Sequence, residues 1–437
     1  MIELRTDTLS SFLELVIDHR GKTPKKLGSD WAEQGYRAIS ALNIKSDGLV
    51  KTDSIRYVDE STYHKWMKIE IERGDILLTS EAPAGEVILW DNDEKIVLSQ
   101  RVFGLRVNER IYNKYLLYYF QSSVGKNEIN RYSSGSTVFG ISAKMFDLIQ
   151  VRCPSLNSQK KIGDFLYAID QKIACNNKIN AELESMAKLI YYYWFVQFDF
   201  PDENGKPYKS SGGKMVYNEE LKREIPEGWD IDFLSSYIAK DKSGDWGKEA
   251  EQGNYTLNVN CIRGADINGI KGQGDLKSPV RYILPKNSHK IIESGDMVVE
   301  ISGGSPTQST ARATYINAGV LNRFNTPLIS SNFCRVITLK QPKWIYSFFQ
   351  EWQFLYEADF FFGWEGKTSG IKNFLFEQFL ENYKTAIPPE LLLNKYYETV
   401  CDHYNKVQAN LLENQKLAEL RDWLLPMLMN GQVTIKD

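Results

Sequence analysis

The sequence predicts a mixed α/β (α+β) protein in which two globular domains alternate with two long helices that pair as an antiparallel coiled coil. Three observations support this fold class: an internal repeat, two long stretches with heptad-like apolar spacing, and short β-branched segments between turn residues. The predicted segments are globular domains at 1–153 and 225–387, long helices at 154–200 and 388–430, a connector at 201–224 and a tail at 431–437.

The internal repeat decides the organisation of the chain. Residues 154–194 align without a gap with 388–428, which is an offset of 388 − 154 = 234. Upstream segments match in the same order with small shifts: 9–12 with 234–237, 72–78 with 293–299, and Gly140-Ile141 with Gly370-Ile371. Ordered matches of this kind argue against coincidence between two amphipathic helices, so we expect two like domains related by a pseudo-two-fold.

Each globular domain combines short strands with loops rich in Gly, Ser, Thr and Asn. The expected strands are 76–79, 86–90, 95–98, 297–301 and 333–339. The intervening loops are 20–25, 80–85, 131–139, 302–312 and 363–370. The polar, glycine-containing stretch 203–214 predicts a connector between the first helix and the second domain.

The first long helix is expected from Ser158, its N-cap, to about Trp194, and the second from about Leu392 to Leu425, with Pro426 in its last turn. A second apolar stripe lies beside the first seam, at Phe165, Ile179, Met186 and Tyr193. This stripe predicts either a partner surface or packing on the chain's own domains.

Asparagines interrupt both seams at matching positions. Asn176 and Asn180 lie midway along the first helix, and Asn410 and Asn414 midway along the second. Solvated mid-helix asparagines are one interpretation. The other is a buried register layer, in which antiparallel pairing brings Asn176 to Asn414 and Asn180 to Asn410.

Composition and motifs favour a non-catalytic chain. Net charge is −3, no apolar run is long enough to span a membrane, and Glu3 and Asp7 stand where a signal peptide would be basic. The five cysteines and four histidines are scattered, which predicts neither disulfides nor a metal site and makes the cytoplasm the default location. There is no phosphate-binding or hydrolase motif, and no methyltransferase motif, so we expect no catalytic residue and no bound cofactor.

Six short motifs, taken in order, resemble the specificity subunit of type I restriction-modification systems. They are RGKTP (20–24), GDILLT (74–79), APAGEV (82–87), GSTVFGI (135–141), IPEGW (225–229) and LRDWLLP (420–426). The resemblance implies a non-catalytic subunit of a restriction endonuclease and adenine methyltransferase complex. Its globular domains are then target recognition domains, each reading one half of a bipartite site in double-stranded DNA.

The resemblance also implies partners. The helices set the spacer and dock two modification subunits, which bind S-adenosylmethionine, with or without motor-nuclease subunits. One alternative is a self-contained nuclease or methyltransferase with fused recognition domains, and another is a duplicated scaffold unrelated to DNA. Both halves of the chain are used up by the repeat, which leaves little length for an enzyme domain.

Side chains that match base edges or phosphates are Arg, Lys, Asn, Gln, Ser and Thr on loops. The candidate DNA-binding residues are Arg20, Lys22, Lys25, Gln100, Arg101, Ser136 and Thr137 in the first domain and Arg263, Thr307, Gln308, Arg323, Lys367 and Thr368 in the second.

Overall fold

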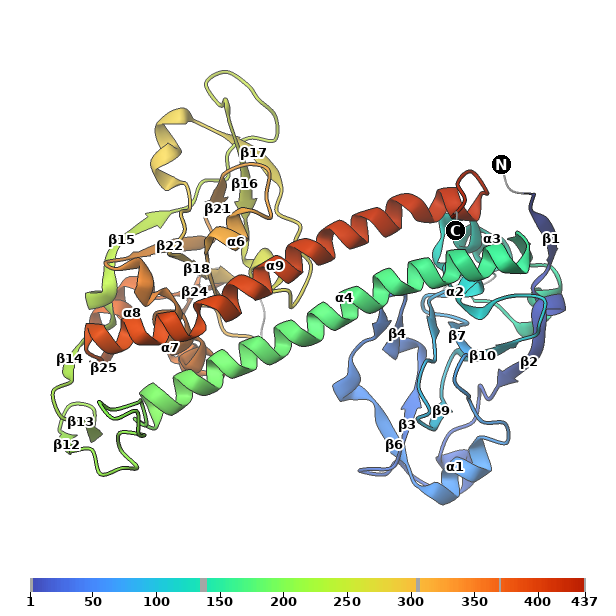
Figure 1. Cartoon of the computed structure of the whole chain (residues 1–437), viewed down its shortest axis with the longest axis horizontal. Helices are drawn as coiled ribbons and strands as arrows, with labels where there is room; N and C mark the ends of the chain where they lie inside the picture. The colour runs from blue at the N-terminus through green and yellow to red at the C-terminus, as the bar shows by residue number, and fades with distance from the viewer. Residues whose placement is uncertain (1–2, 134–139, 304–306, 369–370, 436–437) are drawn as a thin grey trace. The chain divides into compact units, whose positions relative to one another are not determined.

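The structure is a computed structural model that describes residues 3–133, 140–303, 307–368 and 371–435. It contains two compact units, unit 1 (Met1–Ile173 with Lys416–Asp437) and unit 2 (Ala174–Gln415). Helices α4 (Leu156–Tyr191) and α9 (Glu390–Met429) are each divided between the units, with one part in unit 1 and the other in unit 2 (Figure 1). The long helices are therefore part of the two cores rather than separate segments.

Unit 1 is built on a four-stranded antiparallel sheet in the order β2-β10-β7-β8. These strands are Leu13–Asp18, Val102–Val107, Ile76–Thr79 and Val87–Leu89. A smaller sheet has the order β6-β3-β9 (Arg56–Val58, Tyr36–Ile39, Ile96–Leu98), and β1 (Arg5–Thr8) pairs with β11 (Gln150–Cys153). Helices α1 (Glu60–Trp66), α2 (Asn113–Gln121) and α3 (Ser123–Arg131) and the hairpin β4-β5 (Ile44–Lys45, Gly48–Leu49) complete it.

Unit 2 repeats this plan. Its four-stranded sheet is β15-β22-β18-β20 (Ile238–Ser243, Cys334–Leu339, Asp296–Glu300, Ala313–Tyr315). The smaller sheet is β17-β16-β21 (Val280–Ile283, Leu257–Ile262, Leu328–Ser330), and β14 (Asp230–Phe233) pairs with β25 (Lys384–Ile387). Its helices are α5 (Ile267–Ile270), α6 (Ala318–Leu321), α7 (Ile345–Glu357) and α8 (Phe376–Asn382). The predicted duplication and fold class are confirmed strand by strand.

Two further elements are described in unit 2. One is the sheet β19-β24-β23 (Ser302–Gly303, Ile371–Phe374, Glu365–Thr368), whose Ser302–Asn373 pairing corresponds to the Glu81–Gly140 bridge of unit 1. The other is the hairpin β12-β13 (Met215–Asn218, Arg223–Pro226), which crosses the predicted boundary between connector and second domain. Sequence analysis missed this hairpin because each of its strands has only four residues.

A tight turn before β7 and β18 is the most closely repeated detail. The backbone N–H of Glu72 donates to Asp75 Oδ2 at 2.9 Å, and that of Glu293 donates to Asp296 Oδ2 at 2.8 Å. Both aspartates are buried, and the glycine between each pair has a positive φ, +100° and +97°. Glycine is favoured there because other residues are strained in that region.

One of the upstream sequence matches is wrong. Ile141 N–H donates to the Ser80 carbonyl, and Phe374 N–H donates to the Ile301 carbonyl, each five residues after the repeated aspartate. Ile141 therefore corresponds to Phe374 and not to Ile371, because backbone pairing, not a chance Gly-Ile repeat, sets the alignment. Gly370 itself lies outside the described residues.

The ends of the long helices differ slightly from the predicted Ser158–Trp194 and Leu392–Leu425. Helix α4 begins at Leu156, and Ser155 Oγ accepts from the Ser158 N–H at 3.4 Å, so Ser158 lies inside the first turn and is not the N-cap. A π-helical segment, Tyr192–Val196, follows α4. Helix α9 continues through Pro426 to Met429. No helix in the described part of the chain is long and apolar enough to cross a membrane.

The helices run antiparallel in both units. In unit 2, Asn176 Nδ2 donates to Asn414 Oδ1 at 2.9 Å and Asn410 Nδ2 donates to Asn180 Oδ1 at 2.8 Å, the pairings that the sequence register predicts. Asn176, Asn180 and Asn410 are buried. The two asparagine pairs show that residue numbers fall along α9 as they rise along α4. In unit 1, Arg421 Nη1 donates to Asp170 Oδ1 at 2.8 Å and joins the same two helices.

The second apolar stripe divides between its two interpretations. Phe165 packs against the core of unit 1, whereas Ile179, Met186 and Tyr193 are exposed within unit 2. In the aromatic run at the end of this stripe, Tyr191 and Phe195 are buried in the core of unit 2.

Candidate nucleic-acid interface

The loops of unit 1 converge at one edge of its larger sheet. Because the strands are antiparallel, the end of β7 lies beside the starts of β10 and β8, with Thr79 opposite Val102 and Leu78 opposite Val87. Asp18, at the end of β2, lies opposite Phe103 at the same edge. The segments 19–24, 80–86 and 99–101 leave from this edge, and Ile141 joins it through Ser80. We call it the loop edge of unit 1.

Two predicted arginines lie at this edge and are paired with acids. Arg20 makes a two-pronged contact with Asp18, with both N–O distances 2.8 Å, and its guanidinium lies 3.9 Å from the centre of the Phe103 ring. Burial raises the pKa of Asp18, but the Arg20 hydrogen bonds outweigh it and hold that pKa below its ordinary value. Arg101 Nε lies 3.3 Å from Glu81 Oε2, and its backbone φ is +65°, a strained value for a residue with a side chain.

The remaining candidates of unit 1 differ in exposure. Lys22 Nζ donates to the Trp66 carbonyl at 2.7 Å, and burial lowers the pKa of its ammonium group, which indicates a structural role. Lys25 is exposed and has no hydrogen bond or ion pair from its side chain within the described residues. Gln100 is exposed, and its carbonyl accepts from Ala41. Ser136 and Thr137 lie outside the described residues.

Unit 2 has an equivalent loop edge. Glu300 at the end of β18 lies opposite Cys334, and the chain beyond it pairs with β24, with Ser302 opposite Asn373. Thr307 and Gln308 are exposed there, and the Gln308 carbonyl accepts from Lys372 Nζ at 3.3 Å.

Two further candidates of unit 2 are in the neighbouring hairpin. The backbones of Lys367 and Thr368 form part of β23, opposite Lys372 and Ile371 of β24. Their side chains lie outside the part of the chain that can be described.

Two predicted arginines of unit 2 are occupied by internal contacts. Arg263 makes a two-pronged contact with the buried Asp266 and also donates to the Lys277 carbonyl at 2.8 Å. Arg323 donates to the Ile270 carbonyl at 2.7 Å and to Gln408 Oε1 at 2.8 Å, and burial lowers its pKa to about 10. These contacts, together with the burial of Arg323, argue against base reading by either arginine. The partners of Arg323 lie 53 and 85 positions away and could not be found from sequence, whereas Asp266 is only three residues from Arg263 and its pairing depends on the local turn.

Sequence analysis also missed polar residues that organise the two edges. In unit 1 these are Lys45, Ser46 and Glu86, and in unit 2 they are Thr310, Glu365 and Lys372. Glu86 belongs to the APAGEV motif, which was the only signal available. The others lie in segments without a motif.

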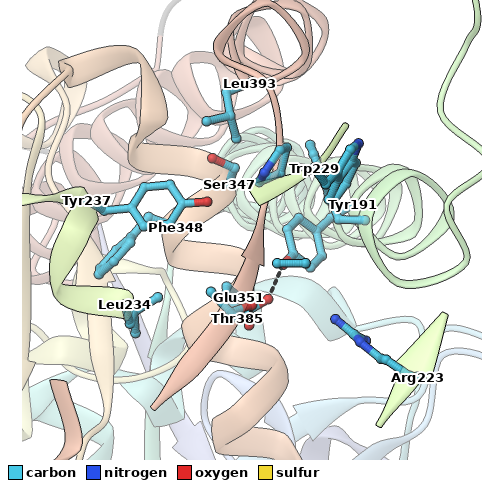
Figure 2. A pocket seen from close by; sticks show the side chains of 13 residues that line it. Tyr191, Arg223, Trp229, Leu234, Tyr237, Ser347, Phe348, Glu351, Thr385 and Leu393 are labelled. Atoms are coloured by element: carbon cyan, nitrogen blue, oxygen red, sulfur yellow. Dashed lines mark hydrogen bonds between the residues drawn. The ribbon is translucent and has the colours of Figure 1, made fainter. Parts of the chain in front are cut away.

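A small pocket lies at the opposite end of unit 2 from its loop edge, next to Tyr237, which precedes the start of β15 (Figure 2). Its volume is about 30 Å³, space for about two water molecules. The Glu351 carboxylate accepts from the hydroxyls of Tyr191, Tyr383 and Thr385 at 2.5, 3.1 and 3.2 Å. These contacts anchor the end of α4 in unit 2. Within the described residues, no group of His, Cys, Asp and Glu could hold a metal ion.

Two copies of one α+β domain, each with a polar loop edge and each packed on a stretch of a paired long helix, define a class of bipartite recognition proteins. Comparison with known proteins makes this class specific. Residues 2–185 match the family model described as the type I restriction modification DNA specificity domain. This match confirms, for that part of the chain, the resemblance to type I restriction-modification specificity subunits drawn from its motifs.

Relatives named as specificity subunits show the same similarity, and a solved structure shows the same fold. The MjaIX specificity subunit of Methanocaldococcus jannaschii is 25% identical over 367 residues, which cover 84% of this chain and 79% of the relative. The HindI specificity subunit of Haemophilus influenzae is 23% identical over 426 residues, covering 84% and 88%. The crystal structure of the S subunit from M. genitalium has the same fold, with a TM-score of 0.61 at 14% identity and coverage of 98% and 96%.

Proposed function

We propose that each unit reads one half of a bipartite site in double-stranded DNA through its loop edge. The chain is a non-catalytic specificity subunit of a type I restriction-modification complex, a family whose catalytic activities reside on other subunits. The observation that supports two-part reading is the duplication itself, because the same sheet presents the same edge in each unit.

The side chains at these edges suit the two kinds of DNA contact. Exposed Lys25 is suited to a phosphate, and phosphate contacts supply affinity without sequence preference. Exposed Gln100, Thr307 and Gln308 are suited to base edges in the major groove, where amides and hydroxyls distinguish the base pairs. Arg20 and Arg101 are already paired with carboxylates. We propose that they contact DNA only if they leave these carboxylates or bind the carboxylate and the DNA together.

The partners are modification subunits, two per chain, with or without motor-nuclease subunits. Exposed apolar side chains mark where they would dock. In unit 2, Met186 is 49% and Leu189 65% exposed, and in unit 1, Leu420 is 40% and Trp423 65% exposed. Since 420 − 186 and 423 − 189 both equal 234, the two patches occupy equivalent positions of the repeat. Two equivalent patches fit two copies of one partner.

The partner subunits carry the chemistry in this proposal. They bind S-adenosylmethionine and methylate adenine, and the complex works in the cytoplasm, where the DNA is. A fused nuclease or methyltransferase within this chain has no support, because the described part of the chain is taken up by the two repeated units and their helices.

The test is reconstitution of the full chain with its modification subunits, followed by methylation of a random DNA library. We expect methylation at a two-part motif with a fixed gap, and none by the chain alone. Methylation by the isolated chain, or a complex that binds all DNA equally, would overturn the proposal.

A further inference from the structure

We propose that Glu86 in unit 1 and Glu365 in unit 2 are positioning residues that fix the two loop edges, so that each controls base discrimination in one half-site. This inference rests on the proposed function. It concerns carboxylates that touch no DNA themselves and hold the loops that do.

Glu86 is the residue immediately before β8, and its side chain links this position to the turn of the β4-β5 hairpin. Its Oε2 accepts from both the N–H and the hydroxyl of Ser46 at 2.9 Å, and its Oε1 lies 3.2 Å from Lys45 Nζ. Burial raises the pKa of Glu86, but the Ser46 and Lys45 donors outweigh it and keep that pKa below its ordinary value. Gln121 adds a hydrogen bond to the Ser46 carbonyl at 2.9 Å, so the turn is held from two sides.

Glu365 makes the same set of contacts in unit 2. Its Oε1 accepts from the Thr310 N–H at 2.7 Å and from the Thr310 hydroxyl at 3.1 Å, and its Oε2 lies 3.1 Å from Lys372 Nζ. The side chains of Glu365 and Lys372 are only 6% and 13% exposed. The loop that contains Thr307 and Gln308 is thereby tied to the β23-β24 hairpin.

The Thr310 loop carries a backbone conformation that needs such support. Ala311 has a φ of +71°, and its carbonyl accepts from Trp352 Nε1 at 2.7 Å. A left-handed alanine is strained and persists only where neighbouring contacts hold it. Glu365 binds the residue immediately before it.

We call the contact sets of Glu86 and Glu365 the two clamps. The two glutamates do not occupy equivalent positions of the repeat. The counterpart of Glu86 in unit 2 is Arg312, since Val87 and Ala313 begin the equivalent strands β8 and β20. Arg312 instead pairs with Glu300 through two contacts of 2.8 Å. Each unit therefore combines a carboxylate, a Ser or Thr residue that donates through its N–H and hydroxyl, and a lysine. The two units take these residues from different positions of the repeat. Independent construction of one arrangement at both edges indicates a shared need for a fixed loop.

Fixing a loop affects discrimination more than affinity. Base readout requires side-chain donors and acceptors to be held within fractions of an ångström, whereas phosphate attraction tolerates small displacements. Loss of the carboxylate charge should therefore loosen one loop, weaken the preference for the correct half-site and leave non-specific binding unchanged.

The experiment uses the full chain with its modification subunits and compares Glu86→Gln with Glu365→Gln. Binding is measured on cognate DNA, on DNA altered in either half-site, and on unrelated DNA. We expect Glu365→Gln to lower discrimination at the half-site read by unit 2 by about tenfold, the size of one lost charge-assisted hydrogen bond. Glu86→Gln should do the same at the other half-site, so that each variant controls for the other.

Folding is checked by thermal unfolding. If a glutamine variant is unfolded, Ser46→Ala and Thr310→Val remove only the hydroxyl donor and should give smaller effects at the same half-sites. The inference is overturned if either variant lowers discrimination equally at both half-sites, or if neither lowers it while the unaltered chain remains specific. A lack of sequence preference in the unaltered complex would instead contradict the proposed function.

Discussion

Buried aspartates at the repeated turns show how single residues diverged within a conserved backbone. Asp75 pairs with Arg106 of β10 at 2.9 Å, whereas Asp296 pairs with Lys242 of β15 at 2.8 Å. At the position of Arg106, unit 2 has Thr338, whose hydroxyl donates to Asp296 at 2.6 Å. The turn was kept, but the cation moved from the central strand to the edge strand.

This difference predicts unequal costs of substitution. Asp296→Asn should lower the free energy of unfolding of unit 2 by ~3–5 kcal/mol, because Lys242 is only 5% exposed and would keep only Glu293, which is 71% exposed and 3.9 Å away. Asp75→Asn is the matched control. It should cost less, because Arg106 is 20% exposed and also lies 2.9 Å from Glu72. Denaturant unfolding measures both, and equal losses would contradict the argument.

A second residue-scale prediction concerns DNA affinity. Lys25→Glu should weaken binding and reduce the slope of log affinity against log salt by about one unit, because one phosphate contact is lost. Arg20→Glu is a less direct probe, since Arg20 also neutralises Asp18. Binding measured at several salt concentrations tests this, and an unchanged slope for Lys25→Glu would remove that residue from the interface.

At the scale of elements, the helix pair combines polar pairing on its inner side with apolar exposure on its outer side. Asn410 donates to Asn180, whose own Nδ2 is buried without a partner among the described residues. An incompletely paired amide at a helix interface costs stability, which is the expected price of specifying one register.

A double-mutant cycle tests this pair. Asn410→Leu alone should destabilise the chain by ~1–3 kcal/mol, because the side-chain oxygen Oδ1 of Asn180 loses its donor inside the interface. Asn180→Leu with Asn410→Leu should recover most of that loss, since both amides are then replaced by apolar groups. Thermal unfolding of the three variants gives the coupling, and purely additive losses would show that the two amides act independently.

The outer side of the helices predicts where partners bind. Met186→Lys with Leu189→Lys should abolish one docking site, and Leu420→Lys with Trp423→Lys the other, because charges disfavour burial against an apolar partner. The stoichiometry of modification subunits per chain should fall from two to one for either pair, measured by mass on a sizing column. Leu391→Lys, which is 82% exposed outside both patches, is the control and should leave two subunits bound.

For the whole molecule, duplication makes the two half-sites separable. Exchanging residues 1–150 with those of a relative should change one half of the methylated motif and leave the other half unaltered, because the loop edge of unit 1 is built from residues within that range. Sequencing of methylated sites in cells that carry the complete system measures this. A change in both halves would exclude independent reading.

Much of this organisation was predictable from the sequence. We could predict the repeat, the long helices, five strands and the family from patterns that are local or recur at a fixed offset. Such patterns can be recognised in the sequence without knowledge of the fold. The asparagine pairings followed as well, because antiparallel pairing of two equivalent helices leaves one register in which their interruptions meet.

Only the tertiary structure decided which side chains are free to act. Lys22 and Arg323 have the residue types of DNA contacts, yet they donate to groups 44 and 85 positions away. Arg263 donates both to Asp266, three residues away, and to the Lys277 carbonyl, 14 positions away. The clamps of Glu86 and Glu365 join residues 40 and 55 apart. Such pairings depend on how strands are brought together in space. The sequence by itself therefore determined the class and plan of this protein, and the fold determined which of its polar residues are available to bind.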